Sequence, residues 1–167
     1  GDLVKVTLVN RNIDAGTSLH WHGLDVPDGE DGVAGVTQDA VLPGKSHVYR
    51  FVADQVGTYW YHSHQYSERQ VQGGLVGALV IEPSGFVDPG AAASDVVAVA
   101  HSYKGRSTIN GSTGAQPVSG DVGGRRIRFV NTNQTAMRVA ASVPFTIAAI
   151  DGSEMNGPTS VGTSRYV

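Results

Sequence analysis

Short stretches of strand length dominate the first half of the chain. Apolar and polar residues alternate over residues 4–9 and 48–52, which are rich in β-branched side chains, and residues 57–62 and 75–81 form aromatic and apolar runs. Nothing before Glu82 repeats with the 3.6-residue period of an amphipathic helix. The pattern therefore predicts strands joined by turns.

The second half resumes this pattern after a break. Residues 83–93 have the Pro, Gly, Ala and Ser content of a linker. The strand-like runs that follow it are residues 95–100, 126–131 and 145–150. Strands about every ten residues, without helices, favour an all-β fold of the sandwich type. We expect one domain over residues 1–83 and a second, partial domain over residues 94–167.

Composition narrows the classes of function. The 167 residues are 40% hydrophobic and 16% charged, which suits a packed core. A net charge of −3 offers no basic face to nucleic acid or to an anionic membrane, and no apolar run is long enough to span a bilayer. The chain contains no cysteine, so it has neither a disulfide nor a thiolate metal ligand. We expect no nucleic-acid and no membrane partner.

Four histidines form two matched pairs, His20-Trp21-His22 and His62-Ser63-His64. On an extended chain, residues two apart project from the same face, so each pair presents two imidazoles side by side. Imidazole binds copper, zinc, iron and nickel, whereas hard cations prefer oxygen ligands. Two such pairs on neighbouring strands or loops predict a transition-metal site.

The residues around both pairs resemble the copper-binding motifs of laccase-like multicopper oxidases. The first motif reads His-Trp-His-Gly-Leu at 20–24, and the second reads Gly-Thr-Tyr-Trp-Tyr-His-Ser-His at 57–64. Residues 73–82 resemble the closing strand of the same domain, and a looser likeness continues to residue 152. The resemblance implies Greek-key, cupredoxin-like sandwiches, one nearly complete and one partial.

The resemblance also implies a reaction. Members of this family couple the one-electron oxidation of a substrate to the reduction of dioxygen to water at a trinuclear copper cluster. Copper would be the cofactor of this chain, in sites of type 2 and type 3, and dioxygen would be a partner. A secreted, periplasmic or cell-surface location would follow as well.

Carried over residue by residue, the resemblance assigns roles to the four histidines. His20 would bind the type 2 copper, His22 and His62 one copper of the type 3 pair, and His64 the other. Asp31 matches a carboxylate that delivers protons towards oxygen, although Asp-Gly is also an ordinary turn signal. Gln38 and Trp60 match family positions too, and we interpret them as packing or supporting residues.

Half of the family's cluster ligands are missing from this chain. The type 1 copper that accepts substrate electrons needs a cysteine thiolate with two histidines, and Ser63 stands where a type 1 domain has cysteine. We expect a C-terminal cupredoxin domain or a partner chain to supply the rest. Strand-like residues at both ends favour a fragment, inactive by itself.

Three alternatives involve other classes of protein. A copper-binding or copper-storage module without turnover would keep the histidines but lack proton delivery by a residue such as Asp31. Dizinc hydrolases also use such pairs, but their motif continues with Asp-His, whereas Gly23 and Leu24 follow here. In copper nitrite reductases a cysteine follows the histidine, and this chain has Ser63.

Other polar residues receive structural interpretations. His47 and His101 match no copper motif, and we expect them to be exposed or locally bonded. Arg126 and Arg128 alternate with Ile127 and Phe129, which predicts a two-faced strand with both arginines pointing outward.

Overall fold

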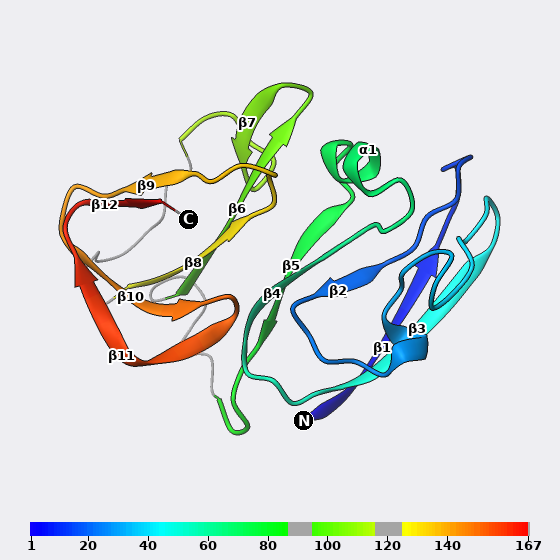
Figure 1. Ribbon diagram of the computed structural model, residues 1–167, viewed down its shortest axis with the longest axis horizontal. Helices are drawn as coiled ribbons and strands as arrows, with labels where there is room; N and C mark the ends of the chain where they lie inside the picture. Colours follow the sequence, from blue (N-terminus) through cyan, green and yellow to red (C-terminus); the bar gives the residue numbers. More distant parts are fainter. Residues whose placement is uncertain (87–94, 116–124, 167) are drawn as a thin grey trace. The chain divides into compact units, whose positions relative to one another are not determined.

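The computed structural model describes residues 1–86, 95–115 and 125–166. The chain divides into two compact units, Gly1–Gly85 and Phe86–Val167. Strands dominate both units, so the predicted all-β class is confirmed (Figure 1). Most of the expected linker at residues 83–93 lies outside the described residues.

The first unit is built from five strands in two antiparallel sheets. Its elements are β1 (Asp2–Val9), β2 (His20–His22), η1 (Asp28–Glu30, a 3-10 turn), β3 (Ser46–Ala53), β4 (Gly57–His62), α1 (Ser67–Gln72) and β5 (Val76–Ile81). β1 pairs with β3, while β4 lies between β2 and β5. The sequence pattern did not predict α1, because this six-residue helix buries a single side chain and so lacks an amphipathic period.

Aromatic residues form the core of the first unit. Trp21, Tyr49 and Phe51 are 2%, 0% and 3% exposed, and the ring centroids of Trp21 and Phe51 lie 4.8 Å apart. Burying a side chain of this kind contributes roughly 2–3 kcal/mol. The alternation along β1 turns three apolar side chains towards this centre, namely Val4, Val6 and Leu8. The core thus anchors β2 through Trp21.

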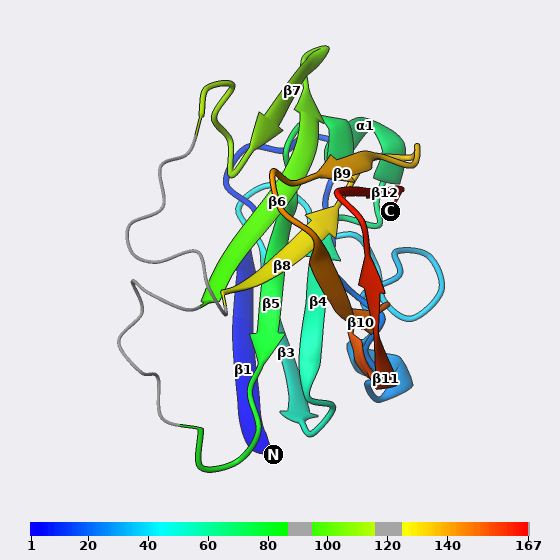
Figure 2. The ribbon, with the colours of Figure 1, turned by 90° about the vertical axis from the view of Figure 1, so that its left-hand side faces the viewer.

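The second unit is also made of strands. Its elements are β6 (Asp95–Tyr103), β7 (Arg106–Ile109), β8 (Arg126–Asn131), β9 (Arg138–Ala140), β10 (Phe145–Ile150), β11 (Ser153–Val161) and β12 (Ser164–Tyr166). β6 lies between β7 and β8 and runs parallel to β8. β10 and β11 form an antiparallel hairpin, visible in Figure 2, and β9 pairs with β12.

The prediction that both arginines of β8 point outward is wrong for Arg128. Its side chain is buried, and its Nε donates to both carboxylate oxygens of Asp95, at 3.0 and 2.8 Å. Ile127, expected to face inward, is 63% exposed. The reason is the parallel pairing with β6, which brings a carboxylate beside β8 and allows a charged side chain to be buried against it.

Replacing Arg128 should destabilise the chain far more than replacing Arg126. Arg128→Met leaves Asp95 without its cationic partner, so the free energy of unfolding should fall by about 3 kcal/mol, the lower end for a broken buried pair because the Asp95 side chain is 32% exposed. Arg126 is 53% exposed and lies 3.7 Å from Glu154, so Arg126→Met should cost less than about 1 kcal/mol. Urea unfolding of both variants measures the difference, and equal losses would contradict a structural role for the buried pair.

Candidate metal centre

The pairing of β2 with β4 places three histidines on one face. In this antiparallel register His20 is opposite His62, and His22 is opposite Trp60. The alternating positions Trp21 and Tyr61 point to the core, where their rings lie 6.0 Å apart. Because burial of Trp21 and Tyr61 is favourable, the imidazoles are held on the opposite side of the sheet.

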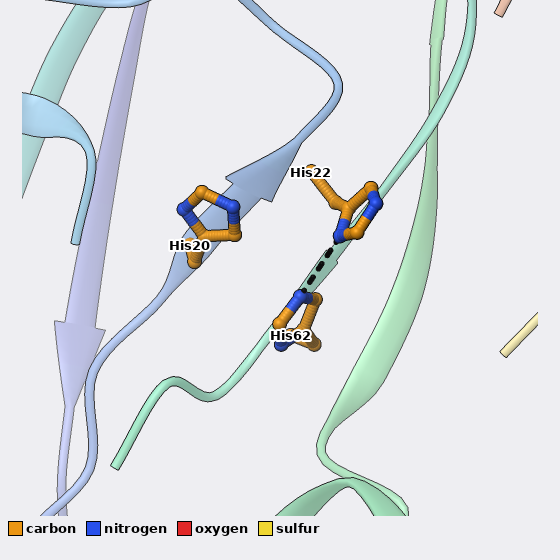
Figure 3. Close-up of side chains that lie close together, drawn as sticks. All are labelled: His20, His22 and His62. Carbon is orange, nitrogen blue, oxygen red and sulfur yellow. Dashed lines mark hydrogen bonds between the residues drawn. The ribbon is translucent and has the colours of Figure 1, made fainter. Parts of the chain in front are cut away.

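The imidazoles of His20, His22 and His62 lie close enough together for one metal-binding group. One ring nitrogen of each lies within 4.8 Å of the others. Figure 3 shows His22 and His62 joined by a hydrogen bond, with His20 beside them on β2. His64 adjoins this group, since its ring centroid lies 5.3 Å from that of His20 and 6.0 Å from that of His62.

Backbone carbonyls hold two of these rings in place. His20 Nδ1 lies 2.8 Å from the carbonyl oxygen of Asp31, and His62 Nδ1 lies 2.9 Å from that of Ser63. A carbonyl only accepts, so both Nδ1 atoms carry the proton and both Nε2 atoms are unprotonated; that of His62 accepts the hydrogen bond from His22. Such a bond at the far nitrogen orients a metal-binding histidine.

Trp60 lies on the same face of the sheet as the histidine group and packs against it. Its ring centroid lies 4.7 Å from that of His22 and 4.4 Å from that of His62, at interplanar angles of 30° and 29°. These contacts restrict the tilt of both imidazoles, which agrees with the interpretation of Trp60 as a packing residue.

Asp31 lies at the edge of the group. Besides its carbonyl contact, its carboxylate oxygen Oδ1 lies 3.2 Å from His20 Nδ1. The neighbouring Gly32 has φ of +74°, and a Cβ there would lie 1.8 Å from the carbonyl oxygen of Leu19. Only glycine allows this approach, which brings the segment after η1 against the start of β2.

The remaining sequence candidates lie outside the group. Gln38 donates to the Asp39 carbonyl at 3.0 Å. His47 packs against Tyr49 at an interplanar angle of 58°, with ring centroids 4.6 Å apart, and is only partly buried. His101 belongs to the second unit, where it is buried and its Nδ1 lies 2.9 Å from the Thr132 hydroxyl.

Sequence reasoning missed two supports of the site. The Tyr49 hydroxyl, fully buried, accepts the Leu19 amide at 2.9 Å, next to His20. Ser63 was considered only as the place of an absent cysteine, yet its hydroxyl bonds to Thr17 and to Gln70. The alternation of strand positions could have indicated that Ser63 faces away from the two histidines.

Burial lowers the pKa of His62 from its ordinary value of 6.5 to about 4. The nearby imidazoles of His20, His22 and His64 lower it further, and the hydrogen bond to the Ser63 carbonyl opposes the shift. The neutral form that metal binding requires is therefore favoured at this position.

The comparison with family models identifies the class of protein. The model described as multicopper oxidase matches residues 1–85, so the chain belongs to the multicopper oxidase family. This confirms the resemblance, and with it the copper-dependent oxidoreductase class. Within the described ranges, no helix has the length and apolar character needed to cross a membrane.

Individual relatives match the first half of the chain. Copper resistance protein A of Pseudomonas syringae pv. tomato is 49% identical over 82 residues, which are 49% of this chain and 13% of that protein. Laccase-3 of Botryotinia fuckeliana is 45% identical over 86 residues, which are 50% of this chain and 19% of that protein. The matched segment is thus a small part of these relatives.

A solved structure extends the likeness to the whole chain. The blue copper oxidase from Nitrosomonas europaea superposes with a TM-score of 0.87 at 24% identity, and the match covers 100% of this chain and 60% of that one. At this identity the likeness concerns the fold, which is cupredoxin-like.

Acidification should destabilise the metal-free chain between about pH 6.5 and pH 4. The unfolded chain protonates His62 near pH 6.5, whereas the folded chain keeps it neutral to about pH 4. The unfolded state therefore binds more protons in this window, and the free energy of unfolding should fall by up to about 3 kcal/mol. Urea unfolding at several pH values measures this loss. His62→Gln should flatten the pH dependence and His47→Gln should preserve it, and the reverse outcome would contradict the assignment.

Proposed function

We propose that this chain supplies half of the ligands of a trinuclear copper cluster, at which a multicopper oxidase reduces dioxygen to water with electrons taken from a substrate. The observation that carries the proposal is the convergence of both histidine pairs on one face. His20 would bind the type 2 copper. His22 and His62 would share one type 3 copper, and His64 would bind the other.

The distance between two ring nitrogens supports the shared copper. His22 Nδ1 lies 3.3 Å from His62 Nε2. Two nitrogens bound to one tetrahedral ion at about 2.05 Å are about 3.3 Å apart, so the spacing of these two atoms suits one ion. Binding would first require His22 Nδ1 to give up the proton that it donates to His62 Nε2. Without metal the same nitrogens are joined by a hydrogen bond, which keeps the rings facing each other.

Bound copper would supply the redox chemistry, and the protein supplies geometry and protons. The Nδ1 contacts of His20 and His62 leave Nε2 of each ring unprotonated, as a metal ligand must be. The carboxylate of Asp31 would pass protons towards the face that carries His20, and its distance of 3.2 Å from His20 Nδ1 supports this role. A storage module has no use for such a group, so this contact favours turnover over storage.

The other ligands and the type 1 copper would come from a further cupredoxin domain or a partner chain. The type 1 site needs a thiolate, and this chain has no cysteine. Residues 94–167 would belong to a second cupredoxin domain, and the chain to a secreted, periplasmic or surface protein, as the family resemblance implies.

Copper binding tests the ligand assignment. His22 is exposed, so His22→Ala should weaken Cu(II) binding at least tenfold without creating a buried cavity. His47→Ala is the matched control and should bind as the unchanged chain does. Isothermal titration with Cu(II) measures both. Equal affinities in the two variants, or no binding by the unchanged chain, would refute the assignment.

Asp31→Asn separates proton delivery from ligand orientation. The backbone carbonyl that orients His20 remains in this variant, so copper content should stay the same. Oxygen consumption by a complete oxidase that carries this segment should fall about 10²–10⁴-fold, because the acid is lost. Asp28→Asn, an exposed acid in η1, should leave both properties unchanged. Full turnover by Asp31→Asn would exclude the proton-delivery role.

By itself, the 167-residue chain should oxidise no phenol at any copper load. Electron entry requires a type 1 copper, and without cysteine that centre and its blue absorption cannot form. An oxygen electrode and an optical spectrum of the copper-loaded chain test this. If the chain oxidised phenol while its spectrum still lacked the blue absorption, the histidine group would have to accept substrate electrons directly.

A further inference from the structure

A closed ring of hydrogen bonds lies behind the histidine group. The Thr17 hydroxyl lies 3.1 Å from that of Ser63, and the Ser63 hydroxyl donates to Gln70 Oε1 at 2.5 Å. Gln70 Nε2 donates to the Gly16 carbonyl at 2.8 Å, and Gly16 is bonded covalently to Thr17. The ring therefore joins the segment before the first histidine pair, the residue inside the second pair, and α1.

The directions of these bonds are fixed by chemistry. The Gly16 carbonyl only accepts, so the Gln70 amide must turn its nitrogen towards Gly16 and its oxygen towards Ser63. Ser63 then donates its one proton to Gln70, and Thr17 donates to Ser63. The Ser63 oxygen also accepts the Gln65 amide at 3.2 Å, which completes its bonding.

Burial makes the ring costly to break. Thr17, Ser63 and Gln70 are 3%, 1% and 8% exposed, so any group left without its partner stays away from water. Gln70 is also the one buried residue of α1, which means that the helix is attached through this amide rather than through an apolar face. Further backbone bonds run from the Ser63 amide to Leu75 and from the Leu75 amide to Gln70.

We infer that Ser63 and Gln70 are positioning residues that set the distance between the two histidine pairs. Thr17 precedes His20 by three residues, and Ser63 adjoins both His62 and His64. A bond between Thr17 and Ser63 therefore ties the two pairs together at a point outside the sheet pairing of β2 and β4. This inference rests on the proposed function for its copper readout, and its metal-free readout is independent of that function.

Hydroxyl removal and conservative rescue test the inference. Ser63→Ala should weaken Cu(II) binding about 10–100-fold and alter the electron paramagnetic resonance spectrum of the bound ion. Ser63→Thr keeps the hydroxyl and with it the hydrogen bonds to Thr17 and Gln70. This variant should bind copper within about threefold of the unchanged chain. Thr108→Val removes a buried hydroxyl that donates to the His101 carbonyl, and should leave copper binding unchanged.

A double variant asks whether Ser63 and Gln70 act as one unit. Gln70→Leu should weaken copper binding as Ser63→Ala does, and combining both changes should cost little more than either one, because each breaks the same ring. Additive losses would show that the two residues act separately and would overturn the ring as the positioning device.

A metal-free measurement keeps the two hypotheses distinguishable. The His20 and His64 rings belong to different pairs and lie 5.3 Å apart, so nuclear Overhauser contacts between their protons report the distance between the pairs without copper. These contacts should persist in Ser63→Thr and in Thr108→Val, and they should weaken in Ser63→Ala. If they persist in Ser63→Ala, or if Ser63→Ala binds copper as the unchanged chain does, the inference is wrong. If the unchanged chain binds no copper while the contacts respond as expected, the proposed function fails and the positioning role stands.

Discussion

The antiparallel pairing of β2 with β4 is the constraint on which the site depends. Its register sets His20 opposite His62 and, through the same alternation, sends Trp21 and Tyr61 into the core. A shift of this register by one residue would bury imidazoles and expose aromatic rings, so the shifted register is strongly disfavoured. The energy that maintains the histidine face therefore comes largely from the opposite side of the sheet.

Period-two alternation explains why so much of the site was predictable. It indicated that His20 and His22 share a face, and the flanking residues supplied the family. Other features depend on partners distant in sequence. Gln70 reaches the site through α1, which has no apolar period, and Arg128 is buried because β6 brings Asp95 beside β8. Local patterns carry no information about such tertiary pairings, which override the ordinary outward preference of arginine.

Backbone and side-chain groups of Asp31 and Ser63 make different contacts around the histidines. Carbonyl oxygens of Asp31 and Ser63 accept hydrogen bonds from two imidazoles, so these two bonds do not themselves require the side chains of Asp31 and Ser63. The side chains make other contacts: the Asp31 carboxylate lies beside His20, and the buried Ser63 hydroxyl bonds to Thr17 and Gln70. Burial of His62 adds a further effect, because the lowered pKa keeps the ring in the neutral form that binds metal.

The stacking of Trp60 on two of the proposed ligands gives the molecule an optical reporter. The chain has two tryptophans, and the other, Trp21, lies in the core on the opposite face of β2. Paramagnetic Cu(II) quenches a nearby indole, most strongly one in van der Waals contact with its ligands. Emission from Trp60 would thus report the occupancy of the centre, from the residue whose ring packs directly against His22 and His62.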